Sequence, residues 1–190
     1  MFSRKTSTHA SKLIQSDDCY FGIFDQSSSV NRPGKWDAEF QEAKRRAGKQ
    51  EWSALFHLNQ IWIDLAVEGS LLSWITLFGG VFKLEVKILP EEPKIEFGEE
   101  ENERFLGEGN KNVLHCPSGK IVVDSLTQLG SSLVIPLIII TPGIYKVGFI
   151  CNDDEESKHQ LLEDVSLYPS NQGPDWIIYM QREAPAALTI

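Results

Sequence analysis

The chain has 190 residues, 42% of them hydrophobic, which suits a single domain with a substantial core. Its 27 Asp+Glu exceed its 18 Lys+Arg, for a net charge of −9; this disfavours direct nucleic-acid binding, which needs clustered cations, and favours a basic protein as partner. The three cysteines, Cys19, Cys116 and Cys151, lie far apart without CxxC spacing, so we expect reduced thiols in a cytoplasmic protein, with no disulfide framework or zinc site.

The N-terminal part of the chain changes character after residue 17. "MFSRKTSTHASKLIQ" is basic and rich in Ser/Thr but lacks the apolar stretch of a secretory signal, so we predict a disordered leader at 1–17 and a single domain at 18–190. The aromatic run "CYFGIFD" (19–25) predicts a strand, and "QSSSVNRPGKW" predicts a loop. Asp37 can cap a short helix near residues 37–48 that ends near Gly48, and it is the only helix that we predict.

The segments that follow are typical of strands. "WSALFHL" (52–58) and "IWIDLAV" (61–67) are interpreted as strands, and "VFKLEVKIL" (81–89) alternates between apolar and charged residues, as a half-buried strand does. The apolar run "LLSWITLFGGVF" (71–82) is short against the roughly 20 residues that a membrane-spanning helix requires. Asp64 and Glu68 precede it, so we predict no transmembrane helix and no membrane partner.

A long acidic segment separates these strands from a second β-rich region. Residues 90–112, "PEEPKIEFGEEENERFLGEGNKN", predict an exposed acidic loop insertion. Strands are then predicted at 113–116, 120–126, 133–140, 144–151 and 175–183, with Pro136 at a bulge or on an edge because proline cannot donate to a central ladder. Repeated short strands with Pro/Gly/Ser turns predict a mainly β fold, an antiparallel β-sandwich or open barrel.

The stretch "HCPSGK" (115–120) is the one most suggestive of catalysis. Pro-Ser-Gly suits a β-turn, and the side chains of His115 and Cys116 would point to opposite faces of a strand, so we favour a turn over a catalytic loop. The four histidines are isolated, and "NDDEES" (152–157) lacks the calcium-loop pattern, so no metal or cofactor is predicted. A hydrolase that uses buried carboxylates or a Cys/His pair remains an alternative.

Charge is distributed unevenly along the chain. Residues 1–50 hold nine Lys+Arg and six Asp+Glu, a balance of +3, whereas residues 51–190 hold nine and twenty-one, a balance of −12. The acidic residues concentrate in two predicted connections. The partner-binding residues that we predict are Glu99, Glu100, Glu101, Glu103, Asp153, Asp154, Glu155 and Glu156.

Two parts of the sequence resemble the competence protein J family. They are "YFGIFDQSSSVNRPGKW" (20–36) and "SGKIVVDSL…LVIPLIIITPGIYKVGFI", within residues 113–151, where a strand ends in a Pro-Gly turn and a tyrosine-bearing strand follows. The resemblance implies a small, mainly β protein, and the namesake of the family inhibits a DNA-entry nuclease. No counterpart is assigned to the insertion at 90–112 or to "DWIIYMQRE" (175–183).

These observations lead to one functional hypothesis with two alternatives. The hypothesis is a non-enzymatic protein-binding module, an inhibitor or immunity protein that covers the basic cleft of a nuclease or toxin with its acidic loops. The alternatives are the hydrolase described above and a homo-oligomeric structural protein that pairs exposed β-edges, a homodimer included.

Overall fold

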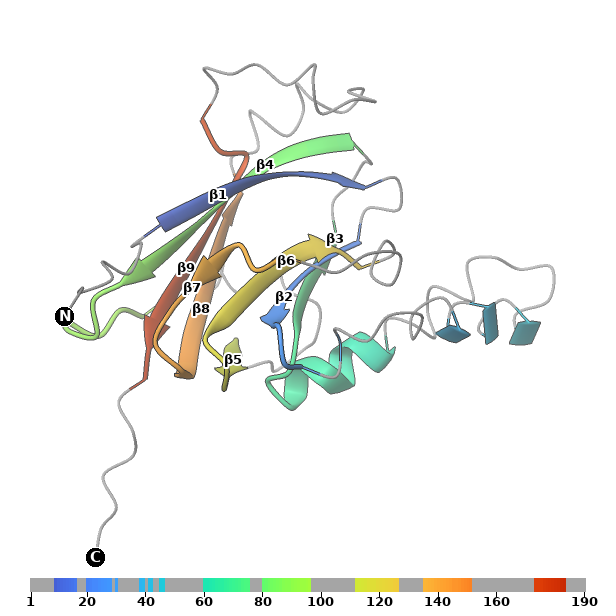
Figure 1. Ribbon diagram of the computed structural model, residues 1–190, viewed down its shortest axis with the longest axis horizontal. Coiled ribbons are helices and arrows are strands. Elements are labelled where there is room, and N and C mark those ends of the chain that lie inside the picture. Colours follow the sequence, from blue (N-terminus) through green and yellow to red (C-terminus); the bar gives the residue numbers. More distant parts are fainter. Residues whose placement is uncertain are drawn as a thin grey trace, which may run out of the picture.

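Two β-sheets packed face to face make up the fold (Figure 1). The computed structural model describes residues 9–16, 20–28, 30, 38–39, 41–42, 45–46, 60–75, 80–96, 112–126, 135–151 and 173–183. The larger sheet has the order β1(His9–Ser16), β4(Gly80–Leu89), β9(Trp176–Arg182), β8(Gly143–Cys151), β5(Val113–Cys116). The smaller sheet has the order β3(Leu72–Ile75), β2(Tyr20–Asp25), β6(Lys120–Ser125), β7(Ile138–Ile139). The prediction of a mainly β fold is therefore confirmed.

All strand pairs within the described ranges are antiparallel except β4 with β9. Asp175, directly before β9, sets the start of this parallel pairing. Its carboxylate accepts a hydrogen bond of 2.6 Å from the backbone N–H of Lys83, and its own N–H donates to the Lys83 carbonyl at 2.8 Å. The start of the last strand is thus tied to β4, although 92 residues separate the two in sequence.

The main core lies between the two sheets and is centred on aromatic rings. Phe21 of β2 lies 4.8 Å from Trp176 of β9 and 5.8 Å from Trp74 of β3, measured between ring centroids. Phe82 of β4 stacks on Trp176 at 4.2 Å. All four side chains are buried, and burying a side chain such as Phe21 contributes roughly 1.5–3 kcal/mol to folding.

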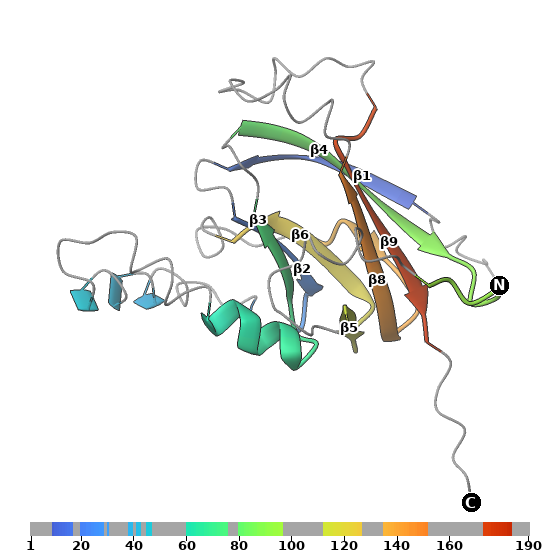
Figure 2. The same ribbon diagram turned by 180° about the vertical axis from the view of Figure 1, so that it is seen from behind.

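A second, smaller core covers the outer face of β2 and β6. Tyr20 and Phe24, which alternate with the inward-facing Phe21 and Ile23, belong to this cluster, as does Trp62 from a helix at residues 60–67. The helix lies beside β2 in both ribbon views (Figure 1, Figure 2). Because both faces of β2 are covered, all six residues of the strand are buried.

The helix at 60–67 corrects the prediction of a strand at 61–67. Trp62, Leu65 and Ala66 are buried while Asp64 is exposed, a pattern with helical period. Gly69 ends the helix with a φ of 71°, and its N–H donates to the Ala66 carbonyl at 3.0 Å. A glycine in this conformation after the last turn is a common helix C-terminus.

The described residues of the helix predicted near 37–48, namely 38–39, 41–42 and 45–46, are helical. The strand predicted at 52–58 lies outside the described residues. The strand predicted at 133–140 is wrong in its length, because only Ile138–Ile139 forms a strand there among the residues described. Pro136 lies just before this strand, β7, which is an edge of its sheet, as expected for a residue that lacks an N–H.

The prediction of a disordered leader at 1–17 is wrong for residues 9–16, which form β1 and pair with β4 along their whole length. Residues 1–8 and 17 lie outside the described part of the chain. Ile14 faces the core, and Lys12 points toward the smaller sheet, where its ammonium binds Asp124 at 2.8 Å. A charged residue that points inward from an edge strand discourages pairing with another chain.

No helix in the described ranges is both long and apolar enough to cross a membrane.

Candidate functional site

The "PSG" sequence forms a turn that carries the chain from one sheet to the other. Cys116 ends β5 and Lys120 begins β6, and the N–H of Gly119 donates to the Cys116 carbonyl at 3.2 Å. Gly119 has a φ of 66°, which residues other than glycine rarely adopt, and its carbonyl accepts from the N–H of Ile140 at 2.7 Å. The predicted β-turn is confirmed as a corner between the sheets.

Asp25, the last residue of β2, holds this corner in place. Its carboxylate accepts hydrogen bonds from the Ser118 hydroxyl (2.7 Å) and backbone N–H (3.1 Å), and from the Ser27 hydroxyl (2.5 Å) and N–H (2.9 Å). Burial alone would raise the pKa of the Asp25 carboxyl, but the hydrogen bonds from Ser118 and Ser27 outweigh it, so the pKa lies below its usual value. The "FDQS" and "PSG" motifs therefore form one structural unit.

Cys116, next to this unit, is fully buried and faces the core. Burial, together with the nearby negative charge of Asp25, raises the pKa of the thiol. A cysteine nucleophile needs a lowered pKa and access to substrate, so Cys116 has the properties of a core residue.

His115 points to the opposite face of β5 and is exposed. Its ring lies against Gly69, where an added Cβ would come within 3.0 Å of the His115 Cδ2, and the backbone N–H of His115 donates to the Gly69 carbonyl at 2.8 Å. The end of the helix thus occupies part of the edge of β5. Two of the other histidines, His57 and His159, lie outside the described residues.

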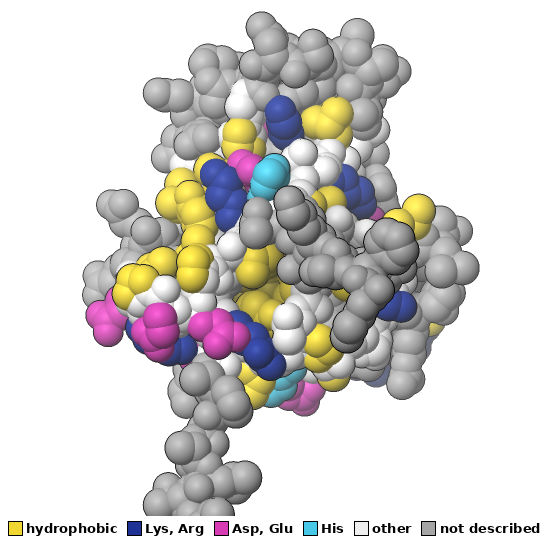
Figure 3. Space-filling model, turned by 60° about the vertical axis from the view of Figure 1, so that its left-hand side comes forward, with side chains coloured by type: hydrophobic (Ala, Val, Ile, Leu, Met, Phe, Trp, Pro, Cys, Tyr) yellow, Lys and Arg dark blue, Asp and Glu magenta, His cyan; other side chains and the backbone are white. Residues whose placement is uncertain are grey.

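The eight predicted partner-binding residues, Glu99, Glu100, Glu101, Glu103, Asp153, Asp154, Glu155 and Glu156, all lie outside the described residues. Of the acidic insertion, residues 90–96 and 112 are described, and they show how it joins the domain. Glu91, Glu92 and Glu96 are exposed there. Figure 3 shows acidic side chains gathered beside basic ones along one margin of the face that it presents.

Gln181, near the end of β9, binds the start of the acidic insertion. Its side-chain Nε2 donates to the carbonyls of Pro90 (2.7 Å) and Pro93 (2.8 Å), and its Oε1 accepts from the N–H of Ile95 (2.9 Å). The residue is only 2% exposed. Both N–H groups of this buried amide and one lone pair of its oxygen are therefore directed at residues 90–95.

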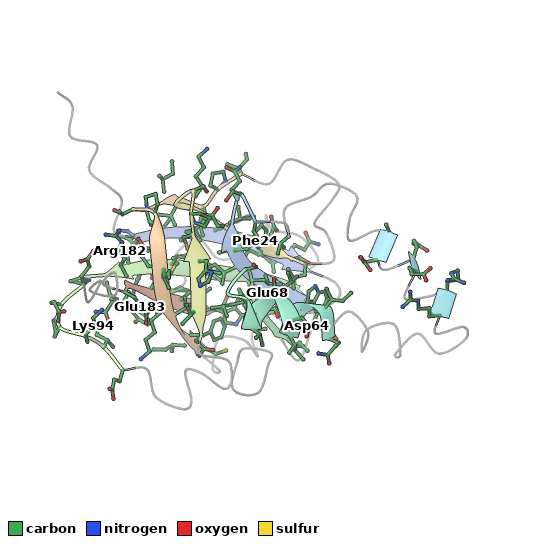
Figure 4. The ribbon with its side chains drawn as sticks, turned by 90° about the horizontal axis from the view of Figure 1, so that it is seen from below. Phe24, Asp64, Glu68, Lys94, Arg182 and Glu183 are labelled. Atoms are coloured by element: carbon green, nitrogen blue, oxygen red, sulfur yellow. The ribbon has the colours of Figure 1, made fainter. Side chains whose placement is uncertain are left out.

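Arg182 adds an ionic contact beside Gln181. Its guanidinium binds the Glu91 carboxylate at 3.1 Å and donates to the Pro142 carbonyl at 3.0 Å, while Lys94 donates to the Arg182 carbonyl at 3.5 Å. In the view from below, Lys94, Arg182 and Glu183 lie at one end of the sheet, and Asp64, on the helix, and Glu68, directly after it, lie across from them (Figure 4).

Sequence reasoning missed Gln181 and Arg182, although they belong to the C-terminal "DWIIYMQRE" run. The one signal was a polar Gln-Arg pair directly after a run of apolar and aromatic residues, Trp176 to Met180. Among the described residues, no group of three or more His, Cys, Asp or Glu side chains is arranged to hold a metal ion.

The geometry defines a two-sheet β-protein in which residues 90–95, the start of the acidic insertion, are anchored to the end of β9. The sequence matches none of the protein-family models and none of the curated proteins with which it was compared. A solved structure described as "Crocagin biosynthetic gene J" is similar over 93% of this chain and 97% of that one, with 23% identity and a TM-score of 0.61. This likeness shows a shared fold and does not extend to function.

A second solved structure, described as ComJ, an inhibitor of the DNA-degrading activity of NucA from Bacillus subtilis, aligns over 94% of this chain and 97% of its own. The identity is 11% and the TM-score 0.38. At this TM-score the likeness carries no argument for the resemblance to the competence protein J family, which rests on the sequence motifs.

Proposed function

We propose that the protein is a non-enzymatic, cytoplasmic module that binds a basic protein, such as a nuclease or toxin, and inhibits it by covering its positively charged cleft. The observation that carries the proposal is that residues 90–95, the start of the acidic insertion, are attached to the end of β9 through Gln181 and Arg182. A binding loop held by a rigid scaffold is a common arrangement in recognition proteins. The choice of a nuclease as partner rests on the sequence resemblance.

Charge gives the proposal its physical mechanism. The balance of −12 over residues 51–190 attracts a basic partner, and complementary charge mainly accelerates association. The proposed contacts are Glu99, Glu100, Glu101 and Glu103, with Asp153, Asp154, Glu155 and Glu156. Because such charges are screened at high salt, the acceleration must weaken as salt rises.

The test begins with capture by the intact protein, elution with a salt gradient and identification of each released protein. A captured basic nuclease is then purified, and its cleavage of DNA or RNA is measured with increasing amounts of the protein. Inhibition at one-to-one stoichiometry supports the proposal. If the protein captures no other protein and its mass in solution shows that it self-associates, the homo-oligomeric alternative would replace the proposal.

A pair of matched variants tests the acidic insertion itself. Glu99→Lys with Glu101→Lys changes the net charge by the same amount as Asp64→Lys with Glu68→Lys, at two exposed positions in the helix and directly after it. We expect the first pair to slow association about tenfold at low salt and the second to have a smaller effect. Equal rates for the two pairs would show that overall charge, and not the insertion, drives association.

A further inference from the structure

A glutamine at position 181 is unusual for the environment that the strand provides. Position 181 is almost completely buried, and the neighbouring Met180 belongs to the core. A buried amide is unfavourable unless its polar atoms are hydrogen-bonded, so an apolar residue is the ordinary choice at such a position. What the amide contributes here is its three hydrogen bonds to residues 90–95.

These bonds join parts of the chain that are 86 to 91 residues apart in sequence. Two carbonyls and one N–H of residues 90–95 find their partner in this single side chain, and Arg182 adds the ion pair with Glu91. The start of the acidic insertion is therefore held on the sheet in the free protein. The exposed Glu92 and Glu96 are within or next to the segment held in this way.

We propose that Gln181 is a positioning residue for partner binding, a role that rests on the function proposed above. A loop that is already ordered binds more tightly than one that must become ordered in the complex, because each residue fixed at that moment loses conformational entropy. Gln181 removes this loss for residues 90–95. It makes no contact with the partner and leaves the charge of the insertion unchanged.

The test uses the purified basic nuclease that the intact protein inhibits, with Gln181→Leu as the variant. Leucine has a similar size and leaves Pro90, Pro93 and Ile95 without their shared partner. Tyr145→Phe is the matched control: it removes a buried hydroxyl that donates to the Thr141 carbonyl at 2.6 Å, a bond that does not involve residues 90–95. Gln181→Asn, one methylene too short to reach all three partners, is the second variant if the leucine variant fails to fold.

We expect Gln181→Leu to raise the dissociation constant about tenfold, which corresponds to about 1.4 kcal/mol. Hydrogen exchange at the Ile95 amide should become faster in the free variant. The slope of log Kd against log salt should stay as in the intact protein, because no charge has changed, whereas reversal of Glu99 and Glu101 should reduce it. The control should change neither the affinity nor the exchange of residues 92–96.

Three outcomes would overturn the inference. An unchanged dissociation constant, with faster exchange at Ile95, would show that holding residues 90–95 is irrelevant to binding, although the proposed function would stand. An equal loss of affinity in Tyr145→Phe would assign the effect to general stability. Failure of the intact protein to bind any basic nuclease would remove the proposed function, and the positioning role with it.

Discussion

The corner between the two sheets allows the effect of one substitution to be worked out in detail. In Asp25→Asn the side chain keeps its size, but one of the two carboxylate oxygens becomes an NH2 group. If the remaining oxygen takes the place of Oδ1, it retains the Ser27 contacts and the Ser118 hydroxyl. The new NH2 group then faces the N–H of Ser118, whose hydrogen bond the carboxylate accepted at 3.1 Å. Two donors cannot bond to each other, so this N–H loses its partner.

The expected loss of stability is about 2 kcal/mol. An unsatisfied N–H costs about 1–3 kcal/mol when it is buried, and the N–H of Ser118 is partly buried. Hydrogen bonds to a charged acceptor contribute about 1 kcal/mol more than bonds to a neutral one, and part of this is also lost. Urea unfolding followed by tryptophan fluorescence measures the difference, since Trp74 and Trp176 lie in the core. Glu92→Gln, the same chemical change at an exposed position, should leave the free energy of unfolding nearly unchanged.

The pH dependence provides a second check of the same reasoning. The pKa of Asp25 is lower in the folded protein than in the unfolded chain, so the stability that its ionised form contributes is present above the unfolded value, about 3.9. It is lost as pH falls through the folded pKa. The stability gap between the intact protein and Asp25→Asn should therefore be constant above about pH 5 and shrink below about pH 4. A stability gap that stays constant down to about pH 3, or no gap at neutral pH, would show that the ionised Asp25 carboxylate does not stabilise the corner.

Two further predictions concern the same region. Gly119→Ala should destabilise the protein by more than about 1 kcal/mol in thermal unfolding, because φ is positive there and an added Cβ would meet the Ile140 carbonyl oxygen. Gly173→Ala is the control and should be nearly neutral, because an added Cβ there would meet only open space. The Cys116 thiol, whose pKa burial raises, should resist iodoacetamide in the folded protein at mildly alkaline pH and react once unfolded, while the partly exposed Cys151 reacts sooner. Rapid labelling of Cys116 in folded protein, read by peptide mass spectrometry, would revive the cysteine-hydrolase alternative.

Local pattern was sufficient where a strand has one face in the core and the other more open. The alternation in residues 81–89 predicted β4, and the "PSG" turn was recognised because proline and glycine have narrow backbone preferences. Local pattern failed at 61–67, where β-rich composition favoured a strand. Packing of Trp62 and Leu65 on the outer face of β2 stabilises a helix there, and the residues of that face, Tyr20 and Phe24, are about 40 positions earlier in the sequence.

The candidate site also combines features that local sequence predicts with features that only packing decides. Its acidic character, the mainly β fold and the corner at 117–119 follow from the sequence alone, because charge, hydrophobic period and turn preference are properties of short segments. The bonds between Asp25 and Ser118, 93 residues apart, and between Gln181 and residues 90–95 exist only once the strands have paired. Which distant polar groups meet depends on sheet order and register, and only the tertiary structure decides these, because many pairings satisfy the same alternation of apolar and polar residues.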